Sequence, residues 1–170
     1  MFAGPSTTPG QRRRTILCID DYETGLVVRK AFLEAKGYRV LAASSGRQGL
    51  ELLASNPVDG VVVDYKMPEM DGEAVSAEIR RIKPEVPILL FSGYAAEIPP
   101  RLLRLVDGYF PKGESLPEFL VELERVLSGV GGRKSPVTAT LADRLKKSRK
   151  MVQRCKDLLE DTTRRVRRRR

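Results

Sequence analysis

Histidine is absent from the 170 residues of the chain. Its absence excludes a phosphohistidine carrier and removes the most common general base and the most common metal ligand. The chain has only two cysteines, Cys18 in an apolar run and Cys155 in a basic one, too few for a disulfide framework or a zinc site. Any chemistry must therefore use carboxylates, hydroxyls and lysine.

Long apolar runs are also missing. No stretch approaches the roughly 18 residues that a transmembrane helix needs. The first 14 residues lack the apolar centre of a secretory signal and end in Arg12, Arg13 and Arg14. We therefore expect a cytoplasmic protein without a membrane span, in which residues 1–14 form a flexible leader.

Positive charge is concentrated at one end of the chain. Residues 133–170 hold 15 Lys or Arg against 4 Asp or Glu, a net charge of +11, whereas the other 132 residues hold 16 against 18, a net charge of −2. The glycines and the proline of residues 129–137 predict a linker. Thr140 and Asp143 then form a loose capping pair in a basic helical tail, residues 138–170.

Two interpretations of this tail stay open. It is either a solvated, frayed helix, because its arginines repel one another, or a contact surface for nucleic acid, an anionic membrane or an acidic protein. It is too short for a DNA-binding output domain and shows no recognition-helix motif. Sequence-specific DNA binding is therefore not expected.

Short apolar runs alternate with helical patterns in residues 15–128. The runs are continuous and rich in β-branched residues, which favours parallel strands covered on both faces. They occupy residues 15–20, 38–43, 58–64, 86–92 and 107–111. Five such units predict an α/β domain with a doubly wound, five-stranded parallel sheet.

Capping residues mark the ends of the predicted helices. They are Gly37 after the first helix, Ser45 with Gln48 before the second, Asn56 with Pro57 after it, Asp71 before the third, and Ser115 with Glu118 before the fifth. The predicted apolar faces are Val75, Ile79 and Ile82 in the third helix, and Leu116, Leu120, Leu123 and Leu127 in the fifth. Pro99 and Pro100 limit the fourth helix to about two turns from Pro100.

Five polar residues fall at the carboxyl ends of the predicted strands, where ligand sites form in such sheets. They are Asp20 and Asp21 after the first strand, Asp64 after the third, Ser92 at the end of the fourth and Lys112 after the fifth. Three close carboxylates need a cation to offset their repulsion, and Mg²⁺ suits oxygen ligands while keeping positions open for phosphate. With magnesium, Lys112 and a hydroxyl beside it, a carboxylate is equipped to attack a phosphoryl group.

The segment "VVVDYKMPEMDG", residues 61–72, fits this chemistry. Its three valines place Asp64 rigidly at the edge of the sheet. Lys66 can offer its backbone carbonyl to the metal, and Pro68 and Gly72 turn the chain sharply into the next helix. The product would be an aspartyl phosphate on Asp64.

Four motifs together resemble those of a response-regulator receiver domain of two-component signalling, similar to a chemotaxis regulator. They are "CIDD" at 18–21, "VVVDYKMPEMDG" at 61–72, "LLFSG" at 89–93 and "GYFPKG" at 108–113. The resemblance covers about residues 14–128, and the order and spacing are nearly those of the family. It implies a (βα)5 flavodoxin-like receiver fold, with the basic tail as an addition.

The resemblance also implies a role for each site residue. Asp64 corresponds to the phosphoacceptor, with Lys112 pairing the phosphoryl group and Ser92 and Tyr109 as the switch residues. The magnesium contacts would be Asp21, Asp64 and the carbonyl of Lys66, with Asp20 acting through water. Serine at position 92 departs from the commoner threonine but keeps the hydroxyl. Lys66 and Tyr94 stand at positions that tune dephosphorylation in the family.

The leading hypothesis is therefore a phosphorylation switch. Asp64 would receive its phosphoryl group from a histidine kinase or a phosphotransfer protein. The signal would pass to a downstream protein through the face of the fourth helix, fifth strand and fifth helix, or through the tail. One alternative is a receiver-fold scaffold that presents the basic tail to a polyanion or an acidic partner without phosphorylation. Another is a metal-dependent phosphatase, although Lys66 stands where such an enzyme would need a second acid.

Overall fold

The fold is that of a computed structural model, which describes residues 12–93 and 98–129. Five parallel strands form one sheet in the spatial order β2-β1-β3-β4-β5. The strands are β1 (Thr15–Ile19), β2 (Arg39–Ala43), β3 (Gly60–Val63), β4 (Ile88–Ser92) and β5 (Gly108–Pro111). The predicted doubly wound α/β sheet is confirmed, and every predicted strand is present.

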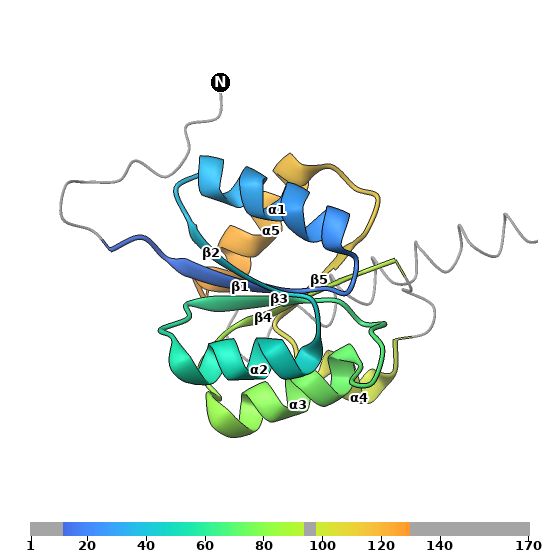
Figure 1. The fold of residues 1–170 in the computed structure, drawn as a ribbon. Helices are drawn as coiled ribbons and strands as arrows, with labels where there is room; N and C mark the ends of the chain where they lie inside the picture. Colours follow the sequence, from blue (N-terminus) through green and yellow to red (C-terminus); the bar gives the residue numbers. More distant parts are fainter. Residues whose placement is uncertain (1–11, 94–97, 130–170) are drawn as a thin grey trace, which may run out of the picture.

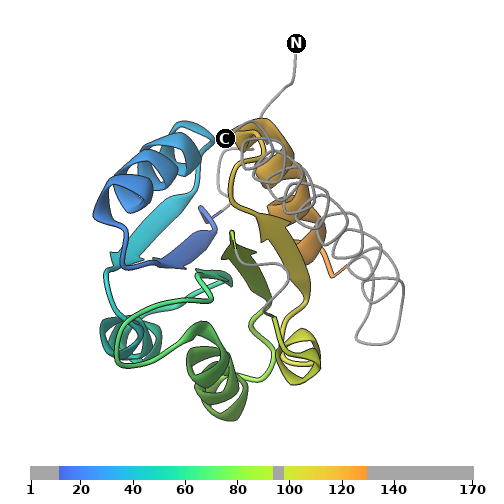
Figure 2. The same cartoon turned by 90° about the vertical axis from the view of Figure 1, so that its right-hand side faces the viewer.

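Helices cover both faces of the sheet (Figure 1). They are α1 (Glu23–Ala35), α2 (Gly46–Ser55), α3 (Gly72–Ile82), α4 (Pro100–Leu103) and α5 (Leu116–Leu127). Helices α1 and α5 lie on one face, and α2, α3 and α4 lie on the other. Figure 2 views the sheet from the edge at which the strands end, with the two helical layers above and below it.

The core consists of two apolar clusters, one on each face of the sheet. Side chains alternate along β1, so Ile16 and Cys18 join the cluster under α1 and α5, whereas Leu17 and Ile19 join the one under α2 and α3. All five residues of β1 are buried, because strands on both sides and helices on both faces cover it. This central strand is the rigid support for the residues that follow it.

The predicted helix caps are present, with one change. The Asp71 carboxylate accepts from the Ala74 N–H at 2.9 Å, and Ser115 and Glu118 form the full capping box. Ser45 caps α2 as predicted. The Gln48 side chain, however, accepts from the N–H of Ser44 at 2.8 Å rather than from that of Ser45.

Three predictions about the helices need correction. Helix α4 has four residues, one turn instead of two: after Leu103 the chain tightens into i→i+3 hydrogen bonds, from the Leu105 N–H to the Leu102 carbonyl among them, and then turns into β5. Ile82 is 39% exposed, since α3 ends there. The fully buried residues of α5 are Phe119, Leu123 and Val126, and the predicted Leu116, Leu120 and Leu127 are only partly buried.

Some predictions lie outside the described residues. They concern Tyr94, the linker beyond Gly129, the basic tail at 138–170 and most of the leader. Within residues 12–93 and 98–129, no helix has both the length and the apolar character to cross a bilayer.

Candidate functional site

Two carboxylates follow β1 at its carboxyl end. The Asp20 N–H donates to the Ala43 carbonyl of β2 at 3.1 Å, so the ladder with β2 fixes its backbone. Asp20 is fully buried, and Asp21, the next residue, is exposed. The end of β1 thus presents one carboxylate inside the protein and one at its surface.

Asp64 follows β3, the neighbour of β1. Its N–H donates to the Ile19 carbonyl at 2.9 Å, which holds the two strand ends together. Asp64 is 4% exposed. The start of α3 approaches its backbone so closely that a Cβ on Gly72 would lie 2.2 Å from the Asp64 carbonyl oxygen. Glycine is required at position 72, because any side chain there would push α3 away from the site.

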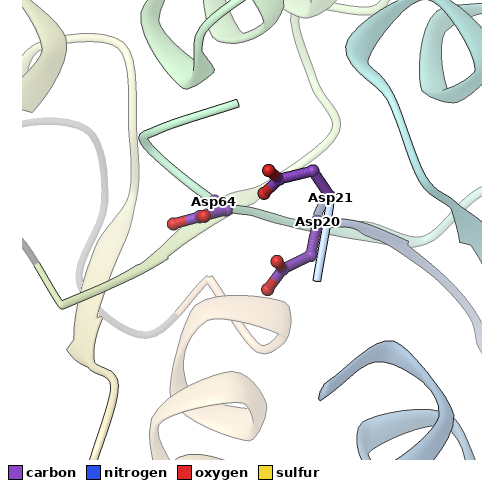
Figure 3. Close-up of side chains that lie close together, drawn as sticks. All are labelled: Asp20, Asp21 and Asp64. Atoms are coloured by element: carbon purple, nitrogen blue, oxygen red, sulfur yellow. The ribbon is translucent and has the colours of Figure 1, made fainter. Parts of the chain in front are cut away.

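The three carboxylates form one cluster (Figure 3). One oxygen from each of Asp20, Asp21 and Asp64 can be chosen so that all three lie within 4.8 Å of one another. This donor set suits a hard divalent cation, which takes carboxylate oxygens and keeps water on its other positions. The structure therefore brings together the three predicted metal-binding side chains in an arrangement that fits such an ion.

Lys112 supplies a positive charge to the cluster. Its Nζ atom lies 2.9 Å from Asp20 Oδ2 and 2.9 Å from Asp64 Oδ2. Lys112 directly follows β5, and its N–H donates to the Ser92 carbonyl at 3.2 Å. The ends of β1, β3 and β5 thus meet at a single charged group, as the strand-edge argument predicted.

Burial raises the pKa of Asp64, and the negative charge of Asp20 adds to this effect. The hydrogen bond and the charge of Lys112 act in the opposite direction, as does the N–H of Tyr65, which donates to Asp64 Oδ1 at 2.7 Å. The ionised form of this carboxylate is therefore disfavoured by burial and depends on the cation beside it.

Ser92 and Tyr109 lie on the neighbouring strands β4 and β5, and both are buried. The Tyr109 hydroxyl donates to the backbone carbonyl of Ser92 at 3.1 Å. Burial raises the pKa of Tyr109 to about 12, so the phenol keeps its proton. The ring belongs to the same apolar cluster as Ile98, Leu102 and Val106, which connects the end of β4 to the α4 segment.

Lys66 lies in the loop between β3 and α3, two residues after Asp64, and it is exposed. Its backbone carbonyl as a metal contact stays a prediction, as does its influence on dephosphorylation. Tyr94, the second predicted tuning residue, lies outside the described residues.

Sequence reasoning missed Arg29, which joins the site from α1. The residue is 4% exposed, and its Nη2 atom donates to Asp20 Oδ2 at 2.9 Å. A signal was present in the sequence: Arg29 stands between Leu26 and Leu33 at spacings of three and four, the positions that α1 buries. A cation on the apolar face of a helix needs a buried partner.

Comparison with known proteins gives one consistent family. The sequence profile described as "Response regulator receiver domain" matches residues 16–115. The transcriptional regulatory protein RprY of Bacteroides fragilis (strain YCH46) is 30% identical over 127 residues, which cover 74% of this chain and 53% of RprY. The sensor kinase CckA of Brucella abortus (strain 2308) is 32% identical over 117 residues, 66% of this chain and 12% of CckA.

Solved structures agree with the sequence matches. The response regulator protein TrrA of Thermotoga maritima, in complex with Mg(2+)-BeF, superimposes with a TM-score of 0.63 at 26% identity. The alignment covers 66% of this chain and 98% of TrrA. The chain thus corresponds to nearly all of a solved receiver structure, but only to about half of RprY and an eighth of CckA.

Proposed function

The chain belongs to the response regulator receiver domain family, and from this premise we propose that it is a phosphorylation switch with Asp64 as the phosphoacceptor. Family membership carries the fold and the type of signalling. The assignment to Asp64 is supported by the geometry of the pocket in this chain.

Asp64 is the nucleophile of the proposed reaction. One of its oxygens forms a bond to the phosphorus of a phosphohistidine, the N–P bond breaks, and its electron pair returns to the imidazole of the donor. An acyl phosphate on Asp64 and a histidine on the donor result. None of the 170 residues is a histidine, so the phosphohistidine lies outside them.

Lys112 pairs with the charge that changes during transfer. Its ammonium group already lies 2.9 Å from Asp64 Oδ2. A cation at this distance stabilises the negative charge that spreads over the phosphoryl oxygens in the transition state. The Ser92 hydroxyl, from the end of β4, is the proposed hydrogen-bond donor to the same oxygens.

Magnesium is the proposed cofactor. Asp20, Asp21, Asp64 and the backbone carbonyl of Lys66 would hold it. When bound, Mg²⁺ neutralises charge on the phosphoryl oxygens and helps to orient them. Within this chain, Lys112 contacts the carboxylates of Asp20 and Asp64, and the N–H groups of Tyr22 and Tyr65 donate to the same two side chains.

The readout of the switch is proposed to run through Ser92 and Tyr109. Attraction of Ser92 towards the new phosphoryl group would change the position of the Ser92 carbonyl, to which the Tyr109 hydroxyl is bonded. Tyr109 packs in one cluster with Ile98, Leu102 and Val106. A movement at the end of β4 is therefore transmitted to α4 by direct contact.

The phosphoryl donor is proposed to be a histidine kinase or a phosphotransfer protein in the cytoplasm. The names of the relatives fit both sides of such a pathway, since one is a sensor kinase and another a transcriptional regulator. The proposed output surface is α4, β5 and α5, or the basic tail. Both partners stay proposals, because the chain covers only part of these relatives.

One observation carries the proposal: a single lysine bridges carboxylates from two different strands inside a cluster of three. An ion pair with only structural value would be expected to balance its charges, whereas this cluster holds three carboxylates against two cations, Lys112 and Arg29. Such an excess suits the binding of a metal and a phosphoryl group.

The direct test is incubation of the full chain with acetyl phosphate and Mg²⁺, followed by intact-mass measurement. We expect one added phosphoryl group, none in Asp64→Asn, and none after removal of Mg²⁺ with a chelator. Asp71→Asn is the matched control, since asparagine also caps a helix and the fold is kept. Equal labelling of the Asp64→Asn variant would refute the assignment.

A further inference from the structure

Arg29 is an unusual residue for the interior of this domain. It occupies the buried face of α1, with a side chain only 4% exposed. Taking a guanidinium out of water is unfavourable unless its partners compensate for the lost hydration. The Nη1 atom is buried and has no hydrogen-bond partner among the residues that the structure describes. The contact with Asp20 therefore carries most of the compensation.

Both carboxylate oxygens of Asp20 are contacted by other groups of the protein. Its Oδ2 atom lies 2.9 Å from Arg29 Nη2 and 2.9 Å from Lys112 Nζ. Its Oδ1 atom accepts from the N–H of Tyr22 at 3.0 Å. In contrast, no ion pair or hydrogen bond of the Asp21 side chain is found in residues 12–93 and 98–129. Two cations thus converge on one carboxylate of the cluster.

The ring of Phe91 lies close to both cations. Its ring centroid lies 4.2 Å from Arg29 Cζ and 5.8 Å from Lys112 Nζ. The ring also packs against Phe110 and Phe119, with centroid distances of 6.1 Å and 5.3 Å. A guanidinium held over an aromatic face gains further attraction, and this aromatic group leaves it little room to move. Arg29 is therefore positioned independently of any bound ion.

The charge balance of the pocket depends on this residue. Asp20, Asp21 and Asp64 contribute three negative charges, and Lys112 and Arg29 contribute two positive ones. Without Arg29, the same pocket would attract a divalent cation more strongly. The arginine also contacts an oxygen of one of the carboxylates that would hold the metal.

We propose that Arg29 is a resident counter-ion that weakens Mg²⁺ binding and positions Asp20 and Lys112 for phosphoryl transfer. In naming Mg²⁺ as the ion, the inference rests on the proposed function. It goes beyond that function, because it makes α1 a determinant of how much magnesium the switch requires. Arg29 is a positioning residue, since it acts through Asp20 rather than on the reacting atoms.

The test is a titration of the unphosphorylated full chain with Mg²⁺ alone, followed by amide NMR. In Arg29→Gln and Arg29→Met, both neutral, we expect the Kd for Mg²⁺ to fall about tenfold or more, because one positive charge next to a divalent ion is removed. Arg29→Lys, which keeps the charge, should stay near the wild-type value. Lys30→Gln is the matched control: it removes an exposed cation of the same helix, which pairs with Glu34, and should change little.

Unchanged or weaker Mg²⁺ binding in the neutral variants would overturn the proposal. A second measurement needs no variant: the guanidinium protons of Arg29 in the wild-type chain should shift during the titration, and their indifference to saturating Mg²⁺ would also overturn it. Both readouts precede phosphorylation. They therefore remain decisive even if Asp64 never accepts a phosphoryl group, so the two proposals can fail separately.

Discussion

Helix α5 and the α4 segment, on opposite faces of the sheet, are held by different means. Under α5, the rings of Phe91, Phe110 and Phe119 pack edge to face or stacked, and Arg125 adds one hydrogen bond, to the Asp107 carbonyl at 3.2 Å. On the opposite side, α4 is a single turn, and the segment after it is held by polar contacts of Arg80. Helix α5 is thus held mainly by apolar contact along its twelve residues, whereas the short α4 segment combines the buried Ile98, Leu102 and Val106 with the hydrogen bonds of Arg80.

This difference matches what each side has to do. The α1 and α5 side supports Arg29 and Lys112, whose positions have to stay constant around Asp20. The α4 side contacts Tyr109, and in the proposed switch it is where a change at Ser92 would be amplified. Segments with little buried apolar surface open at a lower free energy than a core does. The architecture therefore combines a stiff support, α1 and α5, with a segment that can be displaced, residues 98–107 around α4 (the α4 rim).

The largest expected effect separates the two sides directly. Phe119 in α5 and Leu102 in α4 are both fully buried. We expect Phe119→Ala to lower the free energy of unfolding by about 4 kcal/mol and Leu102→Ala by about 2 kcal/mol, because the single turn of α4 can collapse onto the space left behind. Urea denaturation followed by circular dichroism measures both. Equal losses of unfolding free energy would contradict the difference between α5 and α4.

The polar tether of the rim gives the next prediction. Arg80 donates to the carbonyls of Leu105 at 2.7 Å and Val86 at 2.6 Å, and it also pairs with Asp107. Arg80→Gln should therefore destabilise the fold by about 2 kcal/mol, since buried acceptors lose their donors. Arg81→Gln is the control: it removes an exposed pair with Glu78, and a loss of no more than about 0.5 kcal/mol is expected. Similar losses of unfolding free energy in the two variants would show that the Arg80 contacts stabilise the fold no more than an exposed ion pair does.

Tyr109 connects the rim to the site, and its effect depends on pH. Tyr109→Phe removes the hydrogen bond to the Ser92 carbonyl and should cost about 1 kcal/mol at neutral pH. The pKa of Tyr109 is raised from 10.0 to about 12, so the stability gained from the neutral buried phenol is complete below pH 10 and is lost as the pH rises towards 12. The difference between wild type and variant, measured by urea unfolding across this range, should shrink. A difference that is constant with pH would argue against a buried phenol.

The smallest expected effect lies in the loop beside Asp64. Glu69 is the one non-glycine residue with a positive φ, 63°, in the described part of the chain. Left-handed backbone is unfavourable for residues with a Cβ, so Glu69→Gly should relieve strain. The gain is partly offset by the greater freedom of glycine in the unfolded chain, which leaves up to about 1 kcal/mol of stabilisation. A melting temperature below that of wild type would contradict this expectation.

The sequence was most informative where one local signal was enough. The continuous apolar runs predicted all five strands, and the capping residues Asp71 and Ser115 predicted the starts of α3 and α5. The convergence of Asp20, Asp64 and Lys112 followed from the rule that parallel strands end at one edge. These features depend on hydrophobic pattern and on topology, both of which can be derived from residue order.

Other features depend on contacts that residue order does not specify. The length of α4 was overestimated because the chain after Leu103 forms i→i+3 hydrogen bonds and turns into β5, which residue order does not specify. The role of Phe91 depends on two cations from different elements. Arg29 is a different case: its place on the apolar face of α1 was visible, but only the structure identifies Asp20 as its partner.

Occupation of Asp64 is proposed to displace the α4 rim while α1 and α5 stay in place. The most direct measurement is amide hydrogen exchange of the full chain in Mg²⁺, with and without beryllofluoride as a mimic of the phosphoryl group. We expect altered protection in residues 98–111 and little change in α1 and α5. Unaltered exchange in residues 98–111, or a larger change in α1 and α5 than in that segment, would contradict it.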